Sequence, residues 1–312
     1  MIKFIIMVLT ITTYVSCKNA GSSSADTNVV AAQEDTLKIS LAQWSFHLTL
    51  EAGKMDHLDF APKAAELGFE GVEYVNKFFK DKATDLAYLD KMNQVAAAAG
   101  VKQLLIMIDS EGDLGDTNDS KREEAVNNHY KWVDAAAYLG CHSIRVNAAG
   151  MGKAEEVAAS AVKGLSKLSE YAATKGINVI VENHGGYSSD GTWLSGVIKK
   201  VNMPNCGTLP DFGNFCIKKE KVNNVDSCVQ EYDRYKGVEE LMPYAKAVSA
   251  KSFDFGEMGF ETTIDYFRMM DIIKAAGYSG YIGVEYEGKT LSEEDGVKAT
   301  KSLIEKCLEK KE

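Results

Sequence analysis

The sequence predicts an α/β protein whose main part is a single-domain (β/α)8 TIM barrel, and three observations support this fold class. From Leu37 onward, short β-branched runs alternate with longer amphipathic segments, the pattern of repeated βα units. The pattern gives eight such units, and the chain after Leu37 is close to the length of about 250 residues that one barrel needs. No glycine-rich phosphate turn follows an early strand, as it would in a doubly wound sheet.

Each strand is predicted from an apolar, β-branched run and each helix from an amphipathic segment behind it. The predicted strands are 37–45, 69–75, 101–108, 142–147, 177–183, 206–212, 247–253 and 281–285. The predicted helices are 57–67, 84–99, 120–139, 154–175, 193–201, 238–245, 264–276 and 292–308. Five of these helices are followed by a helix-ending glycine, namely Gly68, Gly100, Gly140, Gly176 and Gly277. A long insertion to about Tyr235 separates the sixth strand from its helix.

The N-terminus is predicted to lie outside the barrel. The apolar run Phe4–Val15 after a single lysine has the form of a secretory signal and is too short to span a bilayer as a helix. Cys17 stands where lipoproteins carry their acylated cysteine, which predicts a signal peptide over 1–17; an ordinary signal peptide is the alternative. Residues 18–36 are predicted as a flexible tether and 37–312 as the barrel. This organisation indicates an exported bacterial lipoprotein, periplasmic or anchored to the outer membrane.

Charge and cysteine content exclude two classes of protein. The net charge of -10 argues against nucleic-acid binding, which needs a surface rich in lysine and arginine. A DNA-repair endonuclease with several zinc ions would also need more than the 5 histidines present. The cysteines show no CxxC spacing, which excludes a zinc ribbon. An exported protein could bridge Cys216 to Cys228 in one loop, and buried free thiols are the open alternative.

Barrel enzymes place their catalytic groups at the C-terminal ends of the strands. The polar residues at those ends are Gln43, Ser45, His47, Glu73, Asp109, Arg145, Asn147, Glu182, His184, Asp211, Asn214, Ser249, Lys251, Glu285 and Glu287. Glu182, Asp211 and Glu285 each close an apolar strand, where a carboxylate is costly to bury unless it is paired or binds a metal. We therefore expect these three carboxylates to meet at one mouth and to form a site for a divalent cation.

Three motifs at these strand ends resemble those of the xylose isomerase-like barrels, the sugar phosphate isomerase/epimerase family. They read VENHGG at 181–186, LPDFGN at 209–214 and GVEY at 283–286. The resemblance extends from Leu37 to the C-terminus. It implies that Glu182, Asp211 and Glu285 bind a divalent metal and that the two glutamates act as acid and base.

One position departs from the family pattern. Members usually carry a metal-binding histidine two residues before a lysine on the seventh strand; here Lys251 is kept but the histidine position holds Ser249. Among the 5 histidines, His184 is the candidate for the missing nitrogen donor. Hydrogen bonding of His184 to substrate or to Asp211 is the alternative. The expected cofactor is Mn²⁺, Mg²⁺, Co²⁺ or Zn²⁺, and a weak or absent metal stays open because of Ser249.

The resemblance implies a metal-dependent isomerase or epimerase for sugars. Glu182 or Glu285 would remove the proton next to a carbonyl, giving an enediolate, and return of the proton would give an epimer or an isomer. Lys251 is the further catalytic candidate. The candidates for substrate binding are Gln43, Trp44, His47, Glu73, Arg145, Asn147 and Asn214.

Export favours a non-phosphorylated sugar or keto-sugar as the small-molecule partner. The same enolate chemistry applied to a 3-keto-glycoside would expel a leaving group, so a lyase or hydrolase is the first alternative. A sugar-binding lipoprotein without catalysis is the second. The sequence predicts membrane contact only through the N-terminal lipid, and the exposed barrel helices are compatible with a homodimer.

Overall fold

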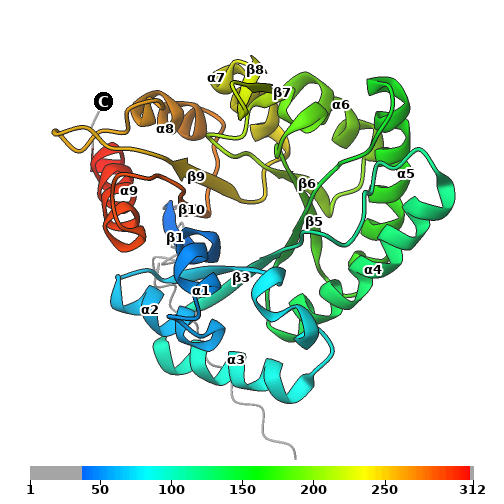
Figure 1. The fold of residues 1–312 in the computed structure, drawn as a ribbon. Helices are drawn as coiled ribbons and strands as arrows, with labels where there is room; N and C mark the ends of the chain where they lie inside the picture. The colour runs from blue at the N-terminus through cyan, green and yellow to red at the C-terminus, as the bar shows by residue number, and fades with distance from the viewer. Residues whose placement is uncertain (1–36, 310–312) are drawn as a thin grey trace, which may run out of the picture. The chain divides into compact units, whose positions relative to one another are not determined.

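A computed structural model describes residues 37–309 as a (β/α)8 barrel, which confirms the predicted fold class. The signal peptide predicted over 1–17, with Cys17, and the tether predicted over 18–36 lie outside the described residues. Figure 1 shows the strands at the centre of the barrel with helices around them. None of the described helices is both long and apolar enough to cross a membrane.

The strands and helices alternate along the chain. The barrel strands are β1 Lys38–Ala42, β2 Gly71–Val75, β3 Lys102–Met107, β4 Ser143–Val146, β5 Asn178–Glu182, β6 Cys206–Leu209, β9 Val248–Ser252 and β10 Tyr281–Tyr286. The helices are α1 His47–Glu51, α2 Phe60–Glu66, α3 Leu86–Ala99, α4 Asp119–Tyr138, α5 Ala154–Ala173, α6 Gly191–Val201, α7 Arg234–Leu241, α8 Tyr266–Ala275 and α9 Glu293–Glu309. Short 3-10 helices lie between them. The eight predicted helices each overlap an observed one.

The eight parallel strands lie in the order β6-β5-β4-β3-β2-β1-β10-β9. The ends of this sheet, β6 and β9, meet through the bridges between Thr208 and Ala245 and between Asp211 and Ser249. The Ser249 amide also donates a hydrogen bond of 2.9 Å to the Pro210 carbonyl. These contacts close the ring and place Asp211 directly opposite Ser249.

Alternation along the strands separates two apolar layers. On β5, Val179 and Val181 pack into the large cluster under the helices, whereas Ile180 belongs to a small cluster with Leu105 and Leu209. Glu182 lies two residues beyond Ile180 and therefore faces the same side, the inside of the barrel. The apolar cluster thus fills the barrel below the carboxylate.

Two strand predictions were wrong at their C-terminal ends. β1 ends at Ala42 and is followed by the 3-10 helix η1, Gln43–Phe46. The chain turns there because the Ser45 hydroxyl forms two hydrogen bonds with the backbone of β10. It accepts one from the Tyr286 amide at 3.0 Å and donates one to the Val284 carbonyl. β6 ends at Leu209 because Pro210 has no amide proton for the ladder.

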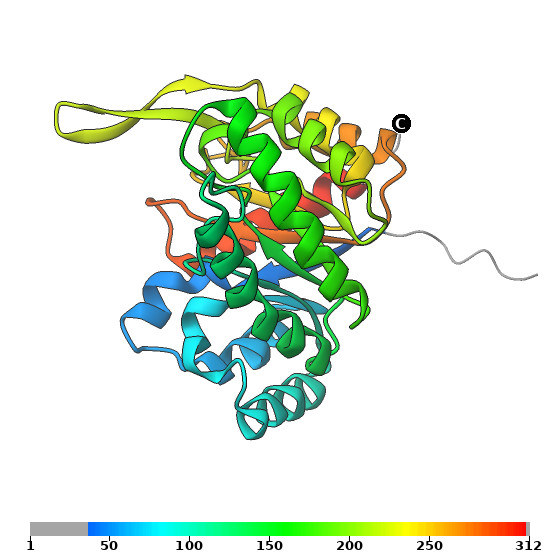
Figure 2. The ribbon, with the colours of Figure 1, turned by 90° about the vertical axis from the view of Figure 1, so that its right-hand side faces the viewer.

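The insertion after β6 forms an antiparallel hairpin that the sequence analysis did not predict. Its strands are β7, Cys216–Val222, and β8, Val225–Glu231. Asn223 and Asn224 connect them with positive φ angles of 52° and 63°, as a two-residue type I′ turn requires. Cys216 and Cys228 form a disulfide, which decides between the two alternatives for this pair. In Figure 2 the hairpin, in yellow-green, projects from the barrel as a long arm.

Candidate active site

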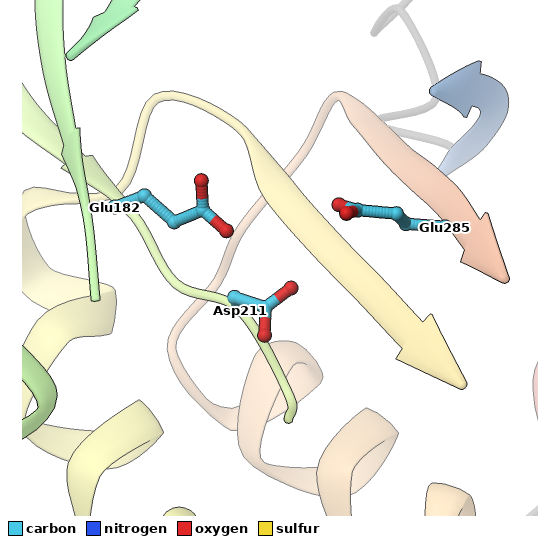
Figure 3. Close-up of side chains that lie close together, drawn as sticks. All are labelled: Glu182, Asp211 and Glu285. Carbon is cyan, nitrogen blue, oxygen red and sulfur yellow. The ribbon is translucent and has the colours of Figure 1, made fainter. Parts of the chain in front are cut away.

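Three buried carboxylates lie together at the C-terminal end of the barrel. Glu182 ends β5, Asp211 follows β6, and Glu285 lies near the end of β10. Each offers an oxygen within 4.8 Å of the others, and all three side chains are buried. Figure 3 shows them pointing toward a common space from these three parts of the barrel. The structure therefore brings together the three residues that close separate apolar strands in the sequence.

Glu182 is held by an arginine and an amide. Arg145 Nε lies 2.9 Å from Glu182 Oε2, and Asn214 Nδ2 donates to Glu182 Oε1 at 2.9 Å. The same guanidinium donates through Nη1 to Asp109 Oδ1 at 2.7 Å. Burial by itself would raise the pKa of Asp109, but the charge and hydrogen bond of Arg145 lower that pKa to about 2. Burial raises the pKa of Glu182 to about 7, with Arg145 opposing the rise.

Asp211 is surrounded by hydrogen-bond donors. Its Oδ1 accepts from the backbone amides of Gly213 and Asn214, both at 2.8 Å, and its Oδ2 accepts from Ser249 Oγ at 2.6 Å. Burial nevertheless raises its pKa to about 7, and the nearby charges of Glu182 and Glu285 add to the rise. Negative charge at this point is therefore only partly compensated by the described residues.

Glu285 contacts the lysine of β9. Lys251 Nζ lies 3.1 Å from Glu285 Oε1 and 3.0 Å from Glu287 Oε2. Burial alone would lower the pKa of Lys251, but the carboxylates of Glu285, Asp211 and Glu287 raise it well above its usual value. Lys251 is therefore a fixed positive charge. Trp44 Nε1 donates to Glu287 Oε1 at 2.9 Å and so connects this carboxylate to the cavity wall.

A cavity of about 740 Å³ opens at this end of the barrel, and of the three carboxylates Glu285 is part of its lining, whereas Glu182 and Asp211 are not. The residues predicted from strand ends that line it are Trp44, Asp109, Arg145, His184, Asn214, Lys251, Glu285 and Glu287. A smaller cavity of about 160 Å³ adjoins it and includes Asn147 in its wall. Asn147 also donates to Asp109 at 2.9 Å, so it supports the partner of Arg145. The larger volume suits a sugar-sized molecule.

Besides Asn147, three predicted substrate-binding residues do not line the larger cavity. Gln43 is fully buried because its amide pairs with His57 and with the Val75 backbone. His47 stacks on Trp44 with ring centroids 4.6 Å apart and contacts the Trp44 carbonyl through Nδ1. The structure therefore gives Gln43 a role in anchoring and His47 a role in supporting the cavity wall.

Glu73 is the third of these residues and lies inside the barrel. It accepts a hydrogen bond of 2.7 Å from Ser40, and its second carboxylate oxygen has no hydrogen-bond partner among the described residues. Gly283 leaves the space for it, because a Cβ at that position would lie 2.6 Å from Glu73 Oε1. Burial raises the pKa of Glu73 to about 7.

His184 lies in the walls of both cavities but is not part of the carboxylate group. Burial lowers its pKa, and the positive charge of Arg145 lowers it further. The ring is therefore a neutral donor or acceptor at neutral pH. Its role as a metal ligand stays a prediction.

The sequence analysis missed Asn183, which fixes the backbone of Asp211. Its Nδ2 donates to the Asp211 carbonyl at 3.0 Å, and its Oδ1 accepts from the Asp211 amide at 2.8 Å. Asn183 is fully buried, and this two-way pairing sets the distance between the ends of β5 and β6. Its place next to Glu182 in a strand-end motif was the available signal.

The three carboxylates fit a divalent cation. Their oxygens are the donors that Mg²⁺ and Mn²⁺ prefer. Burial raises the pKa values of Glu182 and Asp211, and the nearby carboxylates add to the rise, so a bound cation would favour their charged forms. Each carboxylate oxygen keeps acceptor capacity beyond its protein partner. A metal would be held by Glu182, Asp211 and Glu285.

Comparisons with known structures agree with this fold. The chain is similar to 3-keto-D-glucoside 4-epimerase from E. coli, with a TM-score of 0.68, 15% identity and coverage of 87% of this chain and 100% of that chain. D-psicose 3-epimerase gives a TM-score of 0.66 at 14% identity, covering 87% and 99%. A xylose isomerase-like TIM barrel protein from Mycobacterium smegmatis in complex with magnesium gives 0.64 at 16% identity, covering 88% and 97%.

At these identities the similarity to solved structures shows the fold alone. No curated protein matches the sequence significantly. A family model described as xylose isomerase-like TIM barrel does match, over residues 61–307, which is most of the chain and includes all three carboxylates. The chain therefore belongs to the xylose isomerase-like TIM barrel family.

Proposed function

We propose that this protein is a divalent-metal-dependent sugar isomerase or epimerase that acts on a non-phosphorylated sugar or keto-sugar. The observation that carries the proposal is the group formed by Glu182, Asp211 and Glu285, whose member Glu285 lines a sugar-sized cavity. The similar solved structures include sugar epimerases, which supports the proposal at the level of the fold. Binding of a divalent ion would supply an electrophile that stabilises negative charge on a substrate oxygen.

The two glutamates are the groups that would move the proton. A general base works best when its pKa lies near the working pH, and burial brings the pKa of Glu182 to about 7. Glu182 and Glu285 come from different strands, so they can approach a substrate carbon from two directions. Transfer between the two gives an epimer, whereas return by the same glutamate to the neighbouring carbon gives an isomer.

The two buried cations hold these glutamates in place. Arg145 fixes Glu182 from one side, and Lys251 fixes Glu285 from the other. Because Lys251 also lines the cavity, its ammonium can stabilise an enediolate oxygen as negative charge develops there. The proposal assigns catalysis to Glu182, Glu285 and Lys251.

Metal binding and proton exchange test the proposal separately. Isothermal titration with Mn²⁺ and Mg²⁺ should give one site per chain, lost in Glu182→Gln and Asp211→Asn. Glu287→Gln is the matched control, because Glu287 lies on the same cavity wall outside the group of three carboxylates, and it should keep the site.

Proton transfer is measured by NMR as deuterium uptake from D2O into D-fructose, D-psicose and a methyl 3-keto-glucoside. We expect uptake at a carbon next to the carbonyl, and its loss in Glu182→Gln. Release of methanol from the 3-keto-glucoside would assign the lyase alternative. A protein that binds neither ion and exchanges no proton would refute the enzyme proposal and favour a sugar-binding protein.

A further inference from the structure

The mouth of the larger cavity carries positive charge, although the whole chain has a net charge of -10. Three lysines line it from two separate segments: Lys77 and Lys80 from the 3-10 helix η3, Asn76–Lys82, and Lys219 from β7 of the hairpin. All three are exposed, in contrast to the buried Lys251. Charge is thus divided along the cavity, with carboxylates at its floor and lysines at its mouth.

The three lysines differ in whether their ammonium groups already have a partner within the protein. Lys77 pairs with Glu51 and lies over the Trp44 ring, 5.4 Å from its centroid. Within residues 37–309, the side chains of Lys80 and Lys219 have neither an ion-pair partner nor a hydrogen-bond partner. Two ammonium groups that face one cavity are therefore available to a bound molecule.

The two cations at the floor of the cavity, Arg145 and Lys251, are not available to a bound molecule as Lys80 and Lys219 are. Arg145 is engaged by Asp109 and Glu182, and Lys251 is engaged by two glutamates. An anionic group placed there would have to displace a buried carboxylate from its partner, which is costly. The division of charge therefore orients a ligand, with its neutral reacting part at the floor and any anionic group at the mouth.

The hairpin holds Lys219 in a defined place. The Cys216–Cys228 disulfide crosses the hairpin, and Lys219 pairs in register with Cys228. The neighbouring Lys218 forms an ion pair with Glu220 and does not line the cavity. Of these two adjacent lysines, only Lys219 faces the cavity.

We propose that the natural ligand of this cavity is a sugar with an anionic group, a carboxylate or a sulfate, bound by Lys80 and Lys219 at the mouth. The inference rests on the proposed function for the identity of the ligand as a sugar. It adds the substrate class: an acidic sugar rather than a neutral one. The charge recognition itself needs no catalysis and can be tested by binding alone.

The test is isothermal titration of the full chain with matched probes: D-glucose, D-glucuronate and D-glucose 6-sulfate. At low salt we expect at least one anionic probe to bind about tenfold more tightly than D-glucose, the scale of two exposed ion pairs. That preference should shrink when the ionic strength is raised to about 0.5 M, because salt screens the attraction between exposed charges. The preferred anion identifies the group.

Matched variants locate the effect. The double variant Lys80→Met with Lys219→Met should lose the preference for the anionic probe and keep the affinity for D-glucose. Lys218→Met should retain the preference, because Lys218 carries the same charge next to Lys219 but does not line the cavity. Equal affinities for neutral and anionic probes, no binding of any probe, or a preference that survives in the double variant would each overturn the proposal.

The outcome is separable from the proposed function. An anion preference that depends on Lys80 and Lys219, in a protein that exchanges no proton, would support the acidic ligand and refute the enzyme. Proton exchange with D-fructose, without any anion preference, would support the enzyme and refute the acidic ligand.

Discussion

The Ser249 hydroxyl lies 2.6 Å from Asp211 Oδ2 and 3.1 Å from Glu285 Oε2, so one small side chain on β9 contacts two of the three buried carboxylates. A hydroxyl has a single proton to donate, and the shorter contact assigns it to Asp211. Glu285 gains its compensation from Lys251 instead. Ser249 thus stands between two like charges at the position where family members usually carry a metal-binding histidine.

Removal of this hydroxyl should destabilise the protein most when no cation is present. We expect Ser249→Ala to lower the free energy of unfolding by about 1–3 kcal/mol in EDTA, the scale of a hydrogen bond to a buried charge. In Mn²⁺ the loss should be smaller, because a cation would compensate the same carboxylates. Urea denaturation in both buffers measures this. Ser195→Ala, on the exposed side of α6, is the control; equal losses in both buffers would contradict the account.

Arg145 should be among the most sensitive positions in the barrel. It compensates both Asp109 and Glu182 while being buried itself, so Arg145→Met leaves two carboxylates without their cation. We expect a loss of about 3–5 kcal/mol in urea denaturation. Lys167→Met is the control, since Lys167 pairs with Glu123 on the surface and should cost less than about 1 kcal/mol. A loss as small as that of the control would show that Arg145 does not stabilise the site.

The sequence predicted the barrel because each βα unit carries its own local signal. Apolar runs such as the one before Glu182 and helix-ending glycines such as Gly176 depend on neighbours in the chain, and the structure confirms the order of units they indicated. The C-terminal ends of parallel strands meet at one mouth, so residues 182, 211 and 285 could be grouped before any coordinates.

Non-local contacts explain what could not be predicted. Gln43 directly follows an apolar strand, but its amide pairs with His57, which lies on a different element. The role of Asn183 depends on the backbone of Asp211, 28 residues away. Lys219 lies in the cavity only because the insertion folds into a hairpin. Alternation along a strand indicates which face a side chain takes, but not which distant partner it meets.

His57 should make stability depend on pH. The Gln43 carbonyl accepts from the Val75 amide, so its NH2 group donates to His57 Nδ1 at 2.9 Å and favours the neutral ring. Burial lowers the pKa of His57 to about 4, against about 6.5 in the unfolded chain. Above pH 6.5 both states are neutral and His57 has no effect. As the pH falls toward 4, the unfolded state binds a proton that the folded state does not, so stability is lost.

The expected loss from this one residue is about 2–3 kcal/mol between pH 7.5 and 4.5. Urea denaturation at the two pH values measures it, and comparison with His57→Gln removes the contribution of all other groups. The His57→Gln variant should be less stable than the unmodified protein at pH 7.5. Its free energy of unfolding should then fall by about 2–3 kcal/mol less between pH 7.5 and 4.5. Parallel losses in both proteins would mean that His57 is not neutral in the folded state.

The disulfide should stabilise the hairpin and not the barrel. Most side chains of β7 and β8 are exposed, so the hairpin has little apolar core of its own and an isolated two-stranded hairpin is at best marginally stable. The disulfide joins cysteines 12 positions apart, and by restricting the unfolded hairpin it stabilises the folded hairpin by about 3 kcal/mol. In the double variant Cys216→Ser with Cys228→Ser, trypsin should cut after the hairpin lysines at least about tenfold faster. The unfolding midpoint of the barrel should not change, because the barrel strands contribute their own core. A lower midpoint in the variant would show instead that the hairpin and the barrel unfold as one cooperative unit.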